Sequence, residues 1–528
     1  MITVAPASVA NRTRFRSATL LLACVLSSFA ASALAPRPNI LFIIADDLYA
    51  DMSNFTEAGR GRNLTPHLDR LAAGATVMQD QQIVSPVCTP SRYNCLTGRY
   101  ASRATNELFT RQTARAGTTI VAWNSKITLD DRTLPKILQA AGYVTGIAGK
   151  QHVVDVPGRQ RPPVDADPRA PEIKAMLAHN ERAERAALQQ AGFNEAGGLY
   201  TGNAEELSPA VLRVHNMDWV AQAGVDFLGR HAGKGKPFFL YFAPTLTHSP
   251  HSPERSWNAD PRLTPYGVLD TPPAALPSRE DRARRLRESP TTGRHRENLL
   301  WLDDAIGALL QRLEAAGELE RTVIFFFNDN GQDGKGSIYQ SGTHAPSLVW
   351  RHGGFPAGRT SDVRVTNLDF APTILDLAGV AAPAGLFDGR SFRAALEGRT
   401  EPIHELVFFE LGFTRGVRKG DWKYIALRYP SQPERFALVN NPPHLKGLTL
   451  PPGQPAFGHI GGNNNEMAAL RTQPAYFDRD QLYSLKDDPH EQRNLAGDPR
   501  HAATLAEMKR ELQRHLAGLP GGFGELKP

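Results

Sequence analysis

The 528-residue chain contains only three cysteines, and one of them, Cys24, lies close to its start. So few cysteines exclude a scaffold held together by disulfides, and the other two, Cys88 and Cys95, can be two buried thiols or one bridge. Beyond residue 31 the chain also lacks any apolar run of the ~20 residues that a membrane-spanning helix needs. Hydrophobic residues make up 41% and charged residues 22%, which is typical of a globular protein with an ample core.

The first 35 residues predict a secretory signal peptide. Three arginines among the first 16 residues precede an apolar run from Ala18 to Ala31, and Ala33-Leu34-Ala35 supplies a cleavage site between small residues. The run is too short for a membrane anchor. A lipoprotein attached through Cys24 is an alternative, but it would leave a very short hydrophobic stretch before that cysteine. We therefore expect a periplasmic or secreted protein without a transmembrane segment.

Neither sign of charge dominates the chain. The formal net charge is +6, and three of the positive charges lie in the expected signal peptide, so +3 remains on the mature chain. This balance is compatible with an anionic substrate without requiring one, and nothing in it indicates nucleic-acid binding. The arginine-rich segment from Arg279 to Arg296 is interleaved with acidic residues, which is typical of a solvated helix face.

One stretch organises the interpretation of the rest. Residues 88–99 read Cys-Thr-Pro-Ser-Arg-Tyr-Asn-Cys-Leu-Thr-Gly-Arg. They resemble the signature C-x-P-S-R-x-x-x-L-T-G-R of the formylglycine-dependent (type I) sulfatases of the alkaline phosphatase superfamily at all eight fixed positions. Such a match arises by chance in a chain of this length with odds on the order of 10⁻⁸.

The resemblance implies that Cys88 is oxidised before folding to an aldehyde, Cα-formylglycine (3-oxoalanine), so a formylglycine-generating enzyme is an implied partner. A hydrated aldehyde carries two hydroxyls on one carbon. One attacks the sulfur of a sulfate ester, and the other later expels sulfate by collapsing back to the carbonyl. A plain serine or cysteine has no second hydroxyl for that step.

Four apolar segments rich in β-branched and aromatic residues predict buried strands. They are residues 39–45, 143–148, 236–243 and 322–327. Polar residues follow each of them, and ligands of open α/β sheets gather at the carboxyl ends of the strands. The resemblance implies an alkaline-phosphatase-like α/β fold, with a mostly parallel central sheet flanked by helices. A helix is expected from Pro66, another near Pro90, and an amphipathic one from Leu299.

The residues after the first and fourth segments predict a metal site. Asp46 and Asp47 would repel each other at the end of a buried strand unless a cation lies beside them. In the family such a pair binds Ca²⁺, and Asn328-Asp329-Asn330-Gly331 resembles the family motif S/T-D-N-G, although Asn328 replaces the usual hydroxyl residue. An all-oxygen shell suits Ca²⁺, or Mg²⁺, rather than zinc. The implied ligands are Asp46, Asp47, the modified Cys88, Asp329 and Asn330.

The resemblance also implies roles for other side chains. Arg92 would hold the hydrated aldehyde. Residues 149–152 and 334–337 resemble the family motifs G-K-x-H and G-K-G-S/T, so Lys150 and Lys335 would contact the sulfate and His152 would lie near the nucleophile. His248 has the His-x-Pro context of the histidine that protonates the leaving group. His251 is then assigned to the rim or the structure, and His344 stands where many relatives have arginine.

Beyond about residue 400 the pattern changes to alternating strands at 406–410, 414–427 and 481–485, followed by a helix at 502–516. This resembles the small C-terminal sulfatase subdomain, an antiparallel sheet with a packed helix. We expect a signal peptide at 1–35, a catalytic domain at 36–400 and this subdomain at 401–528. The Pro-, Gly- and Asn-rich segment 440–465 is expected to reach over the active-site mouth.

These features predict an exported enzyme that hydrolyses a sulfate ester, with a sulfated carbohydrate as the expected substrate. A phosphonate or phosphate ester hydrolase of the same superfamily is an alternative, because tetrahedral oxyanions suit the same arrangement. A dianionic monoester, however, would favour more positive charge than one metal and two lysines provide. A non-catalytic protein that binds sulfated glycans would require the loss of site residues, and none is lost. The sugar and the position of its sulfate stay open.

Overall fold

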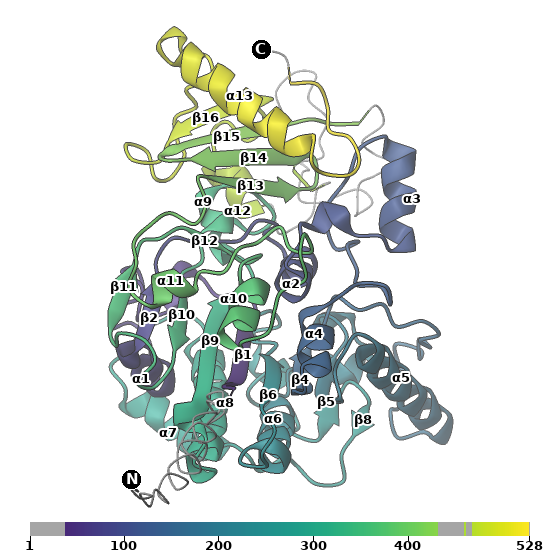
Figure 1. Ribbon diagram of the computed structural model, residues 1–528. Coiled ribbons are helices and arrows are strands. Elements are labelled where there is room, and N and C mark those ends of the chain that lie inside the picture. Colours follow the sequence, from purple (N-terminus) through teal and green to yellow (C-terminus); the bar gives the residue numbers. More distant parts are fainter. Residues whose placement is uncertain (1–36, 431–458, 461–466, 527–528) are drawn as a thin grey trace, which may run out of the picture. The chain divides into compact units, whose positions relative to one another are not determined.

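The computed structural model describes residues 37–430, 459–460 and 467–526. An eight-stranded, mostly parallel sheet lies at the centre of its larger part (Figure 1). Its strand order is β11-β2-β10-β9-β1-β6-β4-β5. The strands are β1 (Asn39–Ala45), β2 (Ala75–Met78), β4 (Val144–Lys150), β5 (Glu195–Tyr200), β6 (Phe238–Ala243), β9 (Thr322–Asn328), β10 (Ser347–Trp350) and β11 (Arg359–Ser361). Two short pairs stand apart, β3 (Gln81–Gln82) with β12 (Val365–Thr366) and β7 (Leu263–Thr264) with β8 (Gly267–Val268).

The four predicted buried strands are confirmed as β1, β4, β6 and β9. β1 pairs in parallel with β6 and β9, and β4 pairs in parallel with β6 and β5. Strand β4 continues two residues beyond its predicted end, so Lys150 is its last residue. Only β10 runs antiparallel to its neighbours, β9 and β2. Polar side chains that follow β1, β4, β6 and β9 therefore meet at one edge of the sheet.

Side chains of successive strand residues point to opposite faces of the sheet, and both faces are apolar. Helices therefore cover both of them. Ile40, Phe42 and Ile44 pack into the core on one face, and Leu41 and Ile43 into the core on the other. The first face is covered by α2 (Cys88–Thr97), α4 (Leu134–Ala140), α5 (Pro171–Gln190) and α10 (Phe370–Leu377), and the second by α1 (Pro66–Gly74), α6 (Met217–His231) and α8 (Arg296–Ala315). Further helices are α3 (Glu107–Ala116), α7 (Arg279–Glu288), α9 (Gln340–Thr343), α11 (Arg393–Leu396) and α12 (Met467–Thr472).

A second, antiparallel sheet of four strands follows, with α13 (Ala502–Leu516) packed on it (Figure 1). The strands are β13 (Leu406–Leu411), β14 (Thr414–Lys419), β15 (Trp422–Leu427) and β16 (Asp480–Ser484). The run predicted at 414–427 is divided into two strands by a turn at Gly420, whose φ is +57°. Glycine adopts this left-handed conformation without steric cost. The expected antiparallel sheet with a packed helix is thus confirmed.

The antiparallel sheet and the signature segment share a core. Val84, Val87 and Tyr100, which flank α2, pack in one cluster with Phe408 and Leu411 of β13. The expected signal peptide, Cys24 and all of the segment 440–465 except residues 459–460 lie outside the described residues. Within the described part of the chain, every helix is too short or too polar to cross a bilayer.

Candidate active site

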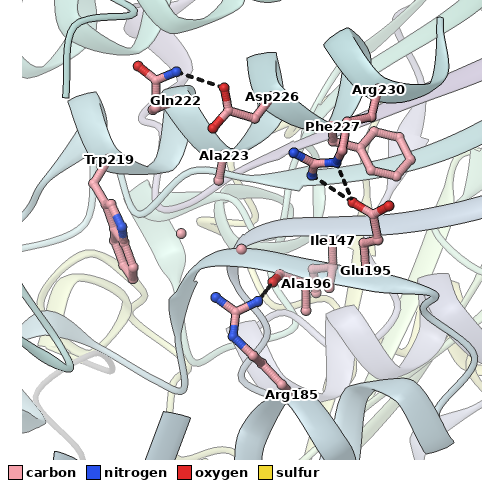
Figure 2. Close-up of a pocket in the computed structure, with 12 residues that line it drawn as sticks. Ile147, Arg185, Glu195, Ala196, Trp219, Gln222, Ala223, Asp226, Phe227 and Arg230 are labelled. Carbon is pink, nitrogen blue, oxygen red and sulfur yellow. Dashed lines mark hydrogen bonds and ion pairs between the residues drawn. The ribbon is translucent and has the colours of Figure 1, made fainter. Parts of the chain in front are cut away.

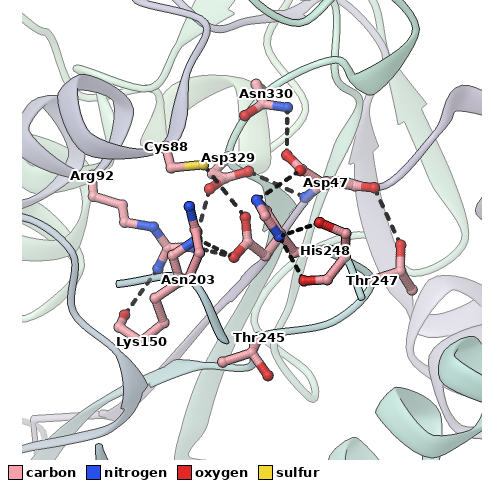
Figure 3. A network of polar contacts seen from close by, with 12 residues as sticks. Asp47, Cys88, Arg92, Lys150, Asn203, Thr245, Thr247, His248, Asp329 and Asn330 are labelled. Atoms are coloured by element: carbon pink, nitrogen blue, oxygen red, sulfur yellow. Dashed lines mark hydrogen bonds and ion pairs between the residues drawn. The ribbon is translucent and has the colours of Figure 1, made fainter. Parts of the chain in front are cut away.

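The carboxyl ends of β1 and β9 bring two pairs of polar residues together (Figure 3). The two strands run side by side in register, with Ala45 opposite Asn328, so the residues that follow are neighbours although they lie more than 280 positions apart in sequence. The backbone amide of Asp329 donates to the carbonyl of Ala45 at 3.1 Å, and that of Asp47 donates to Asp329 Oδ1 at 3.4 Å.

Helix α2 begins at Cys88, two residues before the predicted start near Pro90. A proline in the first turn is compatible with this start, because the amide that it lacks would have no partner inside the helix. The Sγ atom of Cys88 lies 3.6 Å from Asp46 Oδ1. Cys88 and Cys95 are both buried and unbridged, which excludes a disulfide between them. Burial raises the pKa of the Cys88 thiol well above its usual value.

We call Asp46, Asp47, Cys88, Asp329 and Asn330 the cage. Ligand atoms of its three carboxylates and its cysteine all lie within 4.8 Å of one another, and all four side chains are buried. Asn330 Nδ2 donates to Asp47 Oδ1 at 3.1 Å, whereas Asn330 Oδ1 is buried without a hydrogen-bond partner. Burial and the charges of Asp46 and Asp47 raise the pKa of Asp329 to about 6. Crowded carboxylates and an unpartnered amide oxygen are the donor set that a hard cation prefers.

Three buried cations balance the carboxylates of the cage. Lys150 Nζ lies 2.5 Å from Asp46 Oδ2, and Lys335 Nζ lies 2.6 Å from Asp47 Oδ1. Arg92 donates to Asp329 Oδ2 at 3.0 Å. Burial alone would raise the pKa of Asp46, but Lys150, with smaller effects of His248 and Arg92, holds it well below its usual value. The positive charges predicted from the family motifs therefore converge on one point.

Two further predicted residues of the site are histidines. His248 Nε2 is 3.4 Å from Asp47 Oδ2, while its Nδ1 faces the carbonyl of Ser249 at 2.9 Å and Glu205 Oε1 at 3.6 Å. Nδ1 is thus engaged by Ser249 and Glu205, and Nε2 is the atom aimed at the cage. His152 is buried, and its burial together with Lys150 lowers its pKa well below the usual value. His152 is therefore neutral and can accept a proton.

Sequence reasoning missed three polar residues near the cage, because no motif marks residues 155–215. Asn203, in the loop after β5, accepts from Lys150 Nζ at 2.6 Å. Glu205 accepts from the hydroxyl of Ser249 at 3.0 Å and so borders His248. His215 contacts Thr245 through Nδ1 at 2.8 Å, and its Nε2 is buried without a partner. The position of His344, by contrast, is set by a contact of its Nε2 with the carbonyl of Gln79 at 2.6 Å.

A cavity of about 250 Å³ lies elsewhere, at the open edge of β5 between α5 and α6 (Figure 2). Its charged residues are already engaged: Arg230 pairs with Glu195 at 2.6 Å, and Arg185 donates to the carbonyl of Ala196. No residue of the cage lines it. The chemistry is therefore assigned to the cage rather than to this cavity.

Comparisons with known proteins agree with this geometry. A family model for sulfatases matches residues 38–380. The chain is 30% identical to arylsulfatase A of Bos taurus, over 75% of this chain and 76% of that protein. It is 25% identical to N-acetylgalactosamine-6-sulfatase of Canis lupus familiaris, over 98% and 93% of the two chains. An ulvan-active sulfatase of Formosa agariphila is 25% identical, over 92% of this chain and 76% of that protein.

Solved structures share the fold at lower identity. BT4656, solved in complex with its substrate D-glucosamine-2-N,6-O-disulfate, is 19% identical with a TM-score of 0.57, and the match covers 91% of this chain and 98% of that one. The phosphonate monoester hydrolase SpPMH from Silicibacter pomeroyi is 20% identical with a TM-score of 0.56, over 92% and 96% of the two chains. These likenesses extend over both sheets and show the alkaline-phosphatase-like fold.

Proposed function

Because the chain belongs to the sulfatase family and is a sulfuric ester hydrolase, we propose that it is an exported enzyme that desulfates a carbohydrate with an aldehyde made from Cys88. The observation that carries the proposal is the position of Cys88: it opens α2 inside the full set of signature residues, with Sγ 3.6 Å from Asp46. An unmodified thiol there would be a poor nucleophile, because its raised pKa keeps it protonated.

The cage fits a divalent cation, and Asp46, Asp47, Asp329 and Asn330 would hold it together with the modified Cys88. Ca²⁺ is proposed, with Mg²⁺ as the alternative, because all donors would be oxygens. When bound, such an ion neutralises sulfate oxygens and lowers the pKa of a neighbouring hydroxyl. The buried, unpartnered oxygen of Asn330 supports this assignment independently of the family.

The remaining side chains of the site have separate roles in the hydrolysis of the ester. Lys150 and Lys335 supply positive charge for the sulfate oxygens, and Arg92 orients the hydrated aldehyde. Asp329, a buried carboxylate of the cage, receives the proton of the attacking hydroxyl. His248 Nε2, together with Lys335, delivers a proton to the departing alcohol oxygen. His152, held neutral by burial, takes the proton of the second hydroxyl so that sulfate can leave.

A sulfated carbohydrate is the proposed substrate class. Two relatives are named for such substrates, N-acetylgalactosamine-6-sulfatase and the ulvan-active sulfatase. The expected signal peptide at 1–35 supports export to the periplasm or beyond, where such polymers are met. The expected division into a catalytic domain at 36–400 and a subdomain at 401–528 accords with the two separate sheets.

One experiment tests the modification and the reaction together. Mass spectrometry of the tryptic peptide 71–92 from active enzyme should show a loss of about 18 Da, as an aldehyde replaces the thiol of Cys88. The same preparation should hydrolyse 4-nitrophenyl sulfate faster than 4-nitrophenyl phosphate. Unmodified cysteine in fully active enzyme contradicts the proposed nucleophile. Faster hydrolysis of the phosphate would favour the phosphoester alternative.

A further inference from the structure

Three chain segments bring aromatic rings together beside the cage. Tyr49 follows β1, His251 follows β6, and His295 stands directly before α8. The rings of His251 and His295 are stacked, with centroids 3.7 Å apart and an interplanar angle of 18°. The ring of Tyr49 lies 6.2 Å from that of His295. We call these three residues the ring cluster.

The ring cluster lies on the side of the cage where His248 is found. Tyr49 is two residues from Asp47, and His251 is three residues from His248. The charges of His248 and Asp47 both act on the imidazole of His251, which places that ring within electrostatic reach of the cage. The ring cluster therefore neighbours the residue that is proposed to protonate the departing alcohol.

The two imidazoles of the ring cluster are uncharged near neutral pH. Burial, with the neighbouring His295 and His248, lowers the pKa of His251 to about 4, and burial and Arg294 lower that of His295. Each neutral imidazole offers one N–H donor and one acceptor nitrogen. Arg294 lies 4.2 Å from the Tyr49 ring centroid, but it pairs with Asp51 at 3.1 Å, so its charge is balanced.

Two features indicate that the ring cluster is built to contact a ligand. Nδ1 of His251 is buried without a hydrogen-bond partner, although buried polar atoms are nearly always paired. His295 has a φ of +49°, a strained conformation that is uncommon for a residue other than glycine. Its loop is held in place by Gly293, whose amide donates to the carbonyl of Arg62 at 3.0 Å. Such strain concentrates at binding and catalytic sites.

We propose that Tyr49, His251 and His295 form a sugar subsite, which binds the ring that carries the sulfate ester while His248 protonates its oxygen. The inference rests on the proposed function and adds the residues that recognise the leaving group. Ring faces pack against the apolar face of a sugar, and the imidazole nitrogens, Nδ1 of His251 above all, exchange hydrogen bonds with its hydroxyls. The balanced charge of Arg294 favours a neutral, hydroxyl-bearing ring over one with a second anionic group.

The test compares two kinds of ester on the full-length, modified enzyme. One is 4-nitrophenyl sulfate, and the other is a sulfated sugar taken as the fastest substrate in a panel of galactose, N-acetylgalactosamine and N-acetylglucosamine 4- and 6-sulfates. In His251→Ala, the ratio of kcat/KM for the sugar over the aryl ester should fall at least tenfold, mainly through KM. His295→Phe keeps a ring but removes the nitrogens, so it should lower the same ratio by a smaller factor. His352→Ala, at an exposed site paired with Glu320, should leave the ratio unchanged.

The outcomes separate the subsite from the reaction itself. Equal losses on both esters, or no change in the ratio, would overturn the subsite while leaving the sulfatase reaction intact. Wild-type enzyme that cleaves the aryl ester but no sugar of the panel would also overturn it. Inactivity of the modified wild type on every ester would overturn the proposed function first. If His251→Ala unfolds, as circular dichroism would reveal, His295→Phe decides alone.

Discussion

Buried charges of opposite sign stabilise one another in the site. Asp46, Asp47 and Asp329 are buried, and each is paired with a buried cation, Lys150, Lys335 or Arg92 respectively. Removing one member of such a set leaves an uncompensated charge, which is costlier than the loss of an exposed ion pair. Substitutions in the cage therefore need a readout other than loss of activity.

Metal content is such a readout for the acidic residues. In Asp46→Ala, the cage loses one carboxylate while Lys150 stays beside it, so bound Ca²⁺ or Mg²⁺ should fall below 0.1 equivalent together with activity. Elemental analysis of the purified protein measures this. Asp376→Ala, at an exposed position on α10, is the control and should retain the metal. Full activity of the wild type after exhaustive chelation and dialysis would contradict a metal-dependent mechanism.

The role of His248 is tested by the chemistry of the leaving group. A general acid contributes in proportion to how strongly the departing oxygen needs a proton. His248→Ala should therefore lower kcat for a sugar sulfate by ~100-fold or more, and kcat for 4-nitrophenyl sulfate much less, because the phenolate is already stable. Steady-state rates on both esters measure the difference. Equal losses would assign His248 to binding or structure and pass the acid role to Lys335 or His251.

Secondary-structure elements place the functional groups through their ends. Strand β4 delivers Lys150 as its last residue, and the residue before it, Gly149, has a φ of +104°. A Cβ atom at Gly149 would lie 2.0 Å from the carbonyl oxygen of Ala243 on β6. The close approach of these two backbones therefore determines where Lys150 enters the cage.

Gly149→Ala should displace the end of β4 and lower kcat by at least tenfold, because small displacements of catalytic groups have large effects on rate. Gly142→Ala is a matched control. Gly142 also has a positive φ, +92°, but a Cβ atom there meets nothing within 4 Å. Both variants share the conformational strain, and only the first adds the clash. Similar activities in the two variants would show that the packing against Ala243 is unimportant.

Helix α13 adds a pH-sensitive contact to the antiparallel sheet. His515 stacks on Phe408, with ring centroids 4.4 Å apart. Burial lowers the pKa of His515 to about 4, while Asp388 raises it and Arg103 lowers it by smaller amounts. The unfolded chain takes up this proton near pH 6.5, whereas the folded protein does so only near pH 4. Stability from this group is therefore complete above about pH 6.5 and is lost as the pH falls toward 4, by up to ~3 kcal/mol.

His515→Phe keeps the stack but cannot be protonated. Its melting temperature should fall less between pH 7 and pH 5 than that of the wild type, as followed by circular dichroism. His352→Phe, at an exposed site, should behave like the wild type. Parallel melting curves for all three proteins would mean that His515 is solvated in both forms.

At the scale of the whole molecule, the described residues from 38 onward form one compact unit in which the antiparallel sheet packs against the segments that flank the signature helix. The amide of Glu410 on β13 donates to the carbonyl of Val84 at 2.9 Å, and that of Gly412 to Val121 at 2.7 Å. The small sheet is thus bonded to the segments that enter and leave the signature region. Because of these contacts, we expect the two sheets to unfold together.

Export is the remaining prediction at this scale. Expressed with its full sequence in a bacterial host, the protein should be recovered from the periplasm or medium with Pro36 as its first residue, because cleavage follows Ala35. N-terminal sequencing and intact mass measure this. A lipid-modified chain that begins at Cys24 would support the lipoprotein alternative. A full-length chain that stays in the cytoplasm would contradict export.

Features carried by contiguous residues could be predicted from the sequence. An unbroken apolar run predicts each buried strand, and residues that follow the carboxyl ends of parallel strands must lie at one edge of the sheet. This reasoning brings Asp46, Asp47, Asp329 and Asn330 together without coordinates. The signature adds Cys88 because its residues are consecutive. The turn at Gly420 and the earlier start of α2 were missed, since both depend on local backbone geometry that the side-chain pattern does not report.

The sequence by itself therefore determined the family, and it predicted which residues follow the buried strands and form the cage. Only the tertiary structure decided which residues surround it. Asn203, Glu205 and His295 come from loops whose contacts span 44 to more than 50 positions and whose residue types match no motif. The neutral state of His251 depends likewise on burial and on a neighbouring ring. Such properties arise from desolvation and through-space charge, which distant parts of the chain create only when they fold together.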